Sequence, residues 1–149
     1  MINNFLGIAT NPDSITRSNS GNTMGELFFI TEMGSFPDNN WYDNMMTLLS
    51  WWLQSLISFQ NPKIKTAKLR FMEGSFEVDV ERIDSTTVCL NLLSGSTTVL
   101  DCCFCDKEFL IFNICEVTKT LLGKAYSMQW FDEGFVFLKN TLNHLMFYK

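Results

Sequence analysis

Apolar residues recur at steps of three and four along Trp41 to Phe59, WYDNMMTLLSWWLQSLISF, which is the spacing of one face of an α-helix. The preceding SFPDNN offers Asp38 and two asparagines as helix caps, and Pro62 discourages continuation. We predict a buried helix over this stretch. Trp51 points about 100° away from Trp52 around the helix, so we expect Trp52 in the core and Trp51 nearer the surface. The predicted apolar stripe is Trp41, Met45, Leu48, Leu49, Trp52, Leu56 and Phe59.

The clearest strand pairing lies in TAKLRFMEGSFEVDVE, where apolar and polar residues alternate on both sides of Glu73 and Gly74. A tight hairpin centred on that pair sorts every side chain onto one of two faces. One face pairs Lys68 with Asp79 and Arg70 with Glu77. The other is apolar and holds Ala67, Leu69, Phe71, Phe76, Val78 and Val80.

Two further runs, Thr87 to Leu92 and Thr97 to Cys105, predict that the hairpin continues as a four-strand antiparallel meander. An earlier apolar run, Glu26 to Glu32, predicts another strand. The last strand of the meander is apolar on both sides, which favours a central position or cover by helices. We assign Val99, Cys103 and Cys105 to one of its faces, and Leu100, Cys102 and Phe104 to the other.

Asp106 is a good cap for a second helix that ends at Gly123, and a last helix begins near Asp132. Residues 1–24 are rich in Asn, Ser, Thr and Gly, so we expect mostly loop with a short strand near residues 5–9. Residues 25–149 then form a single α+β domain. We expect an antiparallel sheet of about five strands, the N-terminal strand plus the meander, packed on the Trp-rich helix and two C-terminal helices. The last helix should bury Phe135, Leu138, Leu142 and Leu145.

Composition fits a folded domain, because 46% of the 149 residues are hydrophobic and 18% are charged. The five cysteines are odd in number and do not suggest a disulfide framework. The N-terminus lacks a secretory signal, and the apolar run of residues 45–59 is shorter than the roughly twenty residues of a membrane span. We therefore expect a cytoplasmic protein that does not contact a membrane.

Sixteen acidic residues against eleven basic ones give a formal charge of -5. This balance argues against nucleic acid as a partner and favours a protein with a basic surface. Two groups of carboxylates are candidates for contacting it; the alternative interpretation is a solvated face whose charges neutralise one another. The first group is Glu77, Asp79 and Glu81 on the hairpin, and the second is Asp101, Asp106 and Glu108 around the start of the second helix.

No pattern in the chain predicts catalysis. Cys102 and Cys103 alternate across a strand and cannot easily share a metal ion, so we interpret the cysteines as small packing residues. No phosphate-binding glycine motif follows a strand, and no nucleophile motif accompanies His144, the only histidine. Paired carboxylates need no fixed spacing, so acid–base chemistry stays open. The sequence predicts no catalytic residue, no metal and no cofactor.

The segments SFPDNNWYDNMMTLLSWWLQSL and LRFMEGSFEVDV, within residues 35–80, resemble small bacterial α+β proteins similar to the immunity proteins of polymorphic toxin and contact-dependent inhibition systems. The resemblance implies a cytoplasmic protein that binds and neutralises a cognate toxin, often a nuclease, by occluding its active site or substrate path. The shared motifs are structural, so no catalytic residue carries over.

Two other hypotheses remain at this point. One is a small ligand-binding protein or hydrolase, with a pocket between the Trp-rich helix and the sheet. The other is a structural subunit of a homo-oligomer.

Overall fold

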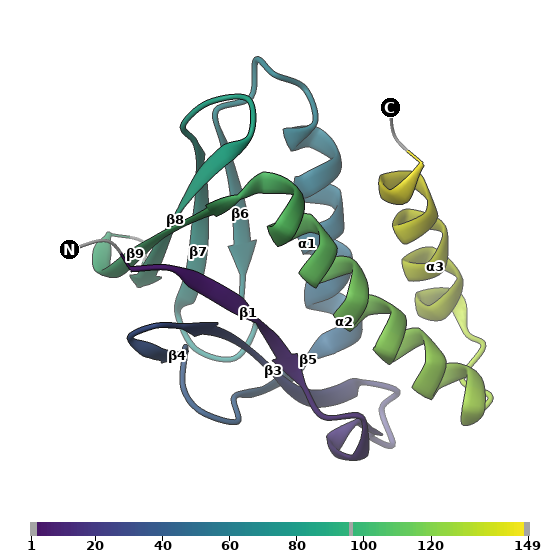
Figure 1. Ribbon diagram of the computed structural model, residues 1–149. Helices are drawn as coiled ribbons and strands as arrows, with labels where there is room; N and C mark the ends of the chain where they lie inside the picture. Colours follow the sequence, from purple (N-terminus) through teal and green to yellow (C-terminus); the bar gives the residue numbers. More distant parts are fainter. Residues whose placement is uncertain (1–2, 96, 148–149) are drawn as a thin grey trace.

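The computed structural model describes residues 3–95 and 97–147 and confirms the α+β class (Figure 1). It contains three α-helices and two antiparallel sheets. The prediction of one sheet, with the N-terminal strand added to the meander, is wrong, because the N-terminal strands pair with one another. The helices are α1 (Met45–Phe59), α2 (Lys107–Ser127) and α3 (Glu133–Met146).

The first sheet is built around β3, which pairs with four short strands. The expected strand near residues 5–9 is confirmed, but the expectation of mostly loop up to residue 24 is wrong. The short polar segments there become strands because β3 supplies their backbone hydrogen bonds. The elements are β1 (Phe5–Thr10), the 3₁₀ turn η1 (Pro12–Ser14), β2 (Thr16–Arg17), β3 (Thr23–Thr31), β4 (Gly34–Phe36) and β5 (Tyr42–Asn44).

The second sheet is the predicted meander, in the order β6-β7-β8-β9. The hairpin register is confirmed, since Lys68 lies opposite Asp79 and Leu69 opposite Val78. The central position predicted for the fourth strand is wrong, because β9 lies at the end of this order. The strands are β6 (Thr66–Arg70), β7 (Phe76–Arg82), β8 (Thr87–Ser94) and β9 (Thr98–Asp106).

Both edges of the meander are covered. On β6, the carbonyl oxygens of Arg70 and Lys68 accept hydrogen bonds from Trp52 Nε1 (2.8 Å) and Ser55 Oγ (3.0 Å) of α1. On β9, the backbone N–H of Phe104 donates to the carbonyl of Asn3 at 3.1 Å. Uncovered strand edges invite pairing with other chains, so these contacts protect the sheet from edge-to-edge association.

Helix α1 begins later than the sequence predicts. Asn44 caps it, accepting a hydrogen bond from Thr47 N at 3.3 Å, and residues 42–44 are extended as β5. The reason is Asp43, which is fully buried. Its Oδ2 accepts hydrogen bonds from Trp41 Nε1 at 2.9 Å and from the backbone N–H groups of Met72 and Glu73 at 3.1 Å each. These contacts hold the start of α1 against the β6–β7 turn.

The core lies between α1 and the two sheets. Trp52 is 0% exposed, and its ring centroid lies 5.6 Å from that of Phe29 and 5.3 Å from that of Phe71. Trp51 is 42% exposed. The predicted orientation of the two tryptophans is therefore confirmed, and the apolar face of the hairpin is the surface that packs against α1.

The C-terminal helices cover the remaining side of α1. Figure 1 shows α2 crossing in front of α1, with α3 beside both. The predicted cap Asp106 is confirmed, and α3 begins beside Asp132 as predicted, with Asp132 as its cap. The predicted end of α2 at Gly123 is wrong, because buried Ala125 continues the apolar stripe and the helix runs to Ser127. Within residues 3–95 and 97–147, no helix is long and apolar enough to cross a membrane.

Candidate functional site

The predicted acidic strip Glu77, Asp79 and Glu81 lies on β7, on the sheet face turned away from α1. Lys68 contacts two of these carboxylates, Asp79 at 3.1 Å and Glu77 at 3.3 Å. Burial raises the pKa of Glu77, as does neighbouring Asp79, and Lys68 opposes the rise. The hydrogen bond to Asp79 is the main reason that the pKa of Lys68 is raised. The strip is therefore partly self-neutralised.

The second predicted group separates into different roles. Asp101 accepts hydrogen bonds from Asn3 Nδ2 at 2.5 Å and from Cys102 N at 2.8 Å, so it ties the N-terminal segment to β9. Asp106 accepts from the first amides of α2. The Glu108 side chain is 76% exposed, and the nearest cation, Lys107, lies 3.9 Å away. Of this group, Glu108 presents the most accessible carboxylate to a partner.

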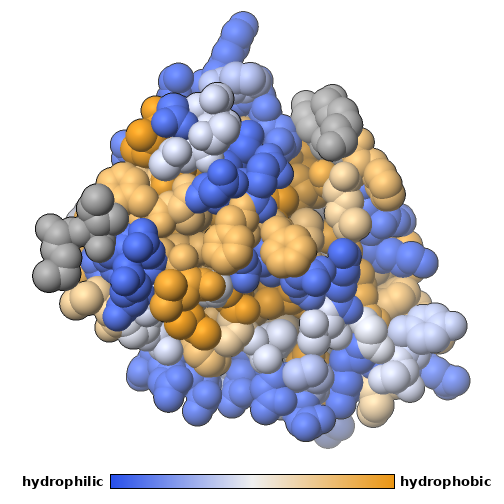
Figure 2. Space-filling view, in the orientation of Figure 1, coloured by the Kyte–Doolittle hydropathy of each residue, from blue (hydrophilic) through white to orange (hydrophobic). Residues whose placement is uncertain are grey.

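Glu108 adjoins a surface that the sequence did not predict. Phe109 and Phe112 of α2 are 41% and 58% exposed, and Leu6 of β1 is 54% exposed. Figure 2 shows apolar surface gathered over the first half of α2 and the neighbouring β1. We call Leu6, Glu108, Phe109, Phe112 and Glu116 the α2 surface. Exposed apolar groups bordered by charge are typical of interaction sites.

Contacts with β1 hold the α2 surface in place. The ring centroids of Phe109 and Phe5 are 5.7 Å apart in an edge-to-face arrangement. One turn later, Asn113 Oδ1 accepts a hydrogen bond from the backbone N–H of Ile8 at 3.2 Å. Gly7 allows this approach, because a Cβ atom there would lie 3.1 Å from the same oxygen. The surface thus rests on paired secondary structure rather than on a loop.

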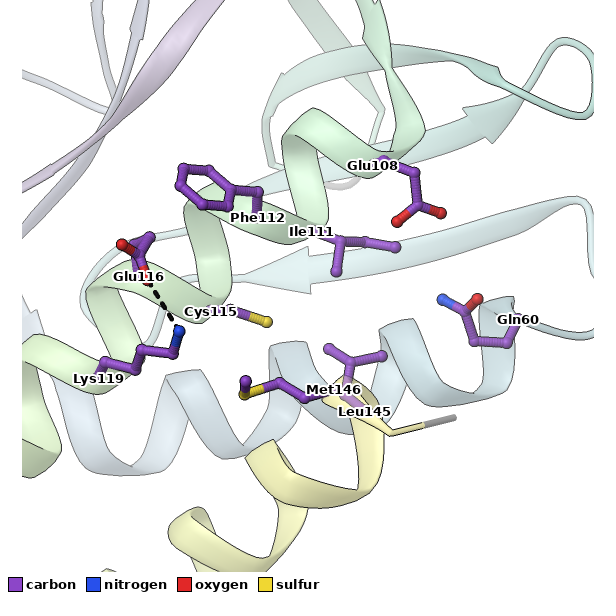
Figure 3. A pocket seen from close by; sticks show the side chains of 9 residues that line it. All are labelled: Gln60, Glu108, Ile111, Phe112, Cys115, Glu116, Lys119, Leu145 and Met146. Carbon is purple, nitrogen blue, oxygen red and sulfur yellow. Dashed lines mark ion pairs between the residues drawn. The ribbon is translucent and has the colours of Figure 1, made fainter. Parts of the chain in front are cut away.

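A groove of about 390 Å³ runs beside the α2 surface (Figure 3). The side chain of Glu108 lies at one end, opposite Gln60 at the end of α1. The ion pair between Glu116 and Lys119, 3.1 Å long, lies at the other end. Apolar and sulfur-containing side chains line the middle: Ile111, Cys115, Leu145 and Met146.

The prediction that the cysteines are packing residues is confirmed for Cys89 and Cys103, which are buried, and is wrong for Cys102, which is exposed. Cys103 and Cys105 share the inner face of β9, opposite Leu90 and Val88, whereas Cys102 faces outward. Burial raises the pKa of Cys103 and of Cys105 to about 12 each. Both thiols therefore stay protonated at neutral pH, and a protonated thiol is a poor nucleophile and a poor metal ligand.

The predicted faces of β9 are wrong at its start. Leu92 pairs with Asp101 and Leu93 with Val99, so Leu100 is an extra residue in a β-bulge. The bulge turns Val99 to the outer face with Cys102, away from Cys103. Val99 and Leu100 are each 56% exposed, so the predicted helix cover is absent at these two positions.

In the part of the chain that the structure describes, no three His, Cys, Asp or Glu side chains gather where they could hold a metal ion. His144 lies on the exposed side of the last turn of α3. Beneath α1, Trp52, Phe71 and Leu69 fill the space against the sheet. A groove of about 330 Å³ does lie where α1 meets β6, lined by Trp51, Ser55, Lys68 and Arg70.

The chain was compared with known protein families, curated proteins and solved structures, and no match was found. Function must therefore be inferred from the surfaces of the molecule itself.

Proposed function

We propose that this chain is an immunity-type protein, which binds a cognate bacterial toxin in the cytoplasm and neutralises it by occluding its active site. The observation that carries the proposal is the α2 surface, where exposed Phe109 and Phe112 stand between the carboxylates of Glu108 and Glu116. The family resemblance of residues 35–80 agrees with this function, and the net charge of -5 favours a basic partner.

The two phenylalanines supply affinity in this proposal. Aromatic side chains bury a large area at a small entropic cost, and a few such residues near the centre of an interface carry most of its binding energy. Because Phe109 is held by Phe5, it is already ordered before the partner arrives. A preordered surface loses less conformational entropy on binding than a flexible one.

The carboxylates supply selectivity and speed. Glu108 and Glu116 flank the aromatic centre, and exposed charges at the rim of an interface accelerate association with a surface of opposite sign. A nuclease toxin carries a basic surface for its nucleic-acid substrate. A tightly bound acidic protein would exclude that substrate by occupying the same surface.

The acidic strip of β7 has a smaller part in this proposal. Two of its three carboxylates already contact Lys68, so a partner would compete with an existing ion pair. Glu81 lacks such a pair among the described residues and is exposed. The strip adds to the long-range attraction of a basic partner more than to close contacts.

The proposal predicts that a gene beside the one for this chain encodes the toxin domain, and the test is binding and inhibition with that domain. Calorimetry at low and high salt should show a stoichiometric complex that weakens as salt screens the charges. The complex should also abolish the toxin's activity in a purified assay. A toxin domain of similar size and charge from an unrelated gene pair is the control, and it should not bind tightly. No complex with the neighbouring toxin at low salt would overturn the proposal.

A further inference from the structure

We infer that the groove beside the α2 surface receives one arginine or lysine side chain of the partner. This inference rests on the proposed function and specifies its chemistry. The groove combines an apolar middle with an accessible carboxylate at one end. A long basic side chain has the same two parts, an aliphatic stem and a charged head.

The middle of the groove fits the stem. Leu145 is 5% exposed and forms part of a firm floor, whereas Met146 is 40% exposed and borders the opening. Figure 3 shows the side chains of Ile111 and Cys115 directed toward the same space. The Cys115 thiol is uncharged at neutral pH, because burial raises its pKa. A methylene chain can lie across these groups without burying an unpaired polar atom.

The end at Glu108 fits the charged head. The 3.9 Å contact of Glu108 with Lys107 is long, so its oxygens can accept further hydrogen bonds. Across the groove, the amide nitrogen of Gln60 donates to the carbonyl of Leu56 at 3.3 Å, which leaves the side-chain oxygen as an acceptor. The N-terminal amides of α2 do not repel a cation strongly here, because Asp106 already accepts from two of them.

Other side chains fit less well. An acidic one would meet Glu108 and Glu116, and the only cation that lines the groove, Lys119, is already paired with Glu116 at 3.1 Å. Lys107, outside the lining, contacts Glu108 only at 3.9 Å. A purely apolar side chain would remove water from Glu108 without supplying a hydrogen bond, which costs free energy. The charges at the groove, two negative and one positive, therefore favour a single cation.

The test uses amide chemical shifts of the full-length ¹⁵N-labelled protein during titration with N-acetyl-arginine methylamide. The amides of residues 60, 108, 111 and 146 should shift and saturate, and N-acetyl-norleucine methylamide, which keeps only the stem, should bind much more weakly. Glu108→Gln should weaken the arginine probe by about tenfold, because a charge-assisted hydrogen bond is lost. Asp38→Asn, which removes an exposed carboxylate that does not line the groove, should titrate like the wild type.

Three results would overturn the inference: no saturable shift at these amides, equal binding of the norleucine probe, or wild-type titration by Glu108→Gln. Failure of the proposed function is distinguishable from these. If the arginine probe binds as expected while the neighbouring toxin forms no complex, the inference about the groove stands and the proposed immunity function is rejected. If the toxin binds wild type and Glu108→Gln equally, only the groove inference falls.

Discussion

The side of α1 that faces the sheets and the outer side of α2 are both rich in aromatic residues. These residues are buried under α1 and exposed on α2. Under α1, Trp52 is fully buried, packs on Phe29 and Phe71, and donates a hydrogen bond to a strand edge. On α2, Phe112 is 58% exposed. The difference separates the residues that stabilise the fold from those available to a partner, so mutation should affect stability in one region and binding in the other.

The largest effect is expected under α1. Trp52→Ala should lower the free energy of unfolding by about 3–5 kcal/mol, because it leaves a large cavity in the core. Trp51→Ala, at the neighbouring but 42% exposed position, should cost less than about 1 kcal/mol. Urea unfolding followed by circular dichroism measures both. Equal losses would show that the two tryptophans do not differ as the structure indicates.

Asp43→Asn should have the next largest effect. The carboxylate accepts hydrogen bonds from three N–H groups through Oδ2, and an amide in its place either turns an NH₂ toward these donors or loses the acceptor on Oδ1. We expect a loss of about 2 kcal/mol in unfolding free energy. Asp38→Asn, at an exposed site before α1, is the matched control and should stay within about 0.5 kcal/mol of the wild type. If Asp43→Asn leaves the free energy of unfolding unchanged, the hydrogen bonds of Asp43 do not determine where α1 begins.

Within α2, a buried residue and an exposed residue can be compared directly. Ile114 is fully buried, so Ile114→Ala should cost about 2–4 kcal/mol of stability. Phe112→Ala should change stability by no more than about 0.5 kcal/mol, because its side chain is already largely hydrated. Thermal or urea denaturation of the two variants measures both changes in stability. A loss at Phe112 as large as that at Ile114 would mean that Phe112 belongs to the core and not to a binding surface.

The smallest effect is a pH dependence at Glu77. Burial raises its folded-state pKa above the ordinary value of 4.5, so the folded protein holds that proton more tightly than the unfolded chain. Relative to Glu77→Gln, the wild type should therefore lose stability as pH rises from below 4.5 through the folded-state pKa. Urea unfolding of both proteins across that range measures the difference. A wild type that gains stability over the same range would show that the ion pair with Lys68 outweighs burial.

Local pattern predicts the hairpin but not the start of α1. Strict alternation fixes which residue faces the core, so the pairing of Leu69 with Val78 follows from the sequence. The helical spacing also continues back to Trp41, yet the chain is extended there. The partners of Asp43 are backbone amides 29 and 30 residues away, and no local pattern contains that information.

In the candidate site, too, the sequence predicts some features and misses those that depend on contacts between residues distant in sequence. Acidic composition predicts a basic partner, but not which carboxylates are free. Asp101 is engaged by Asn3, 98 residues away in sequence. The exposed phenylalanines were missed because apolar residues in a helix are ordinarily assigned to its buried side. Phe109 and Phe112 fall off the stripe of Leu110, Ile114 and Leu121, and that offset is the one signal that could have identified them.

The central claim is that the α2 surface binds the partner and does not stabilise the fold. Its most direct test compares two exposed phenylalanines on different helices. Phe112 of the α2 surface is 58% exposed and Phe137 of α3 is 50% exposed, so either change to alanine should leave the fold intact. If the proposed function holds, affinity for the cognate toxin domain should fall by about tenfold or more in Phe112→Ala and stay unchanged in Phe137→Ala. Calorimetry with both variants gives the answer. Equal affinities, or a loss confined to Phe137→Ala, would contradict the assignment of binding to the α2 surface.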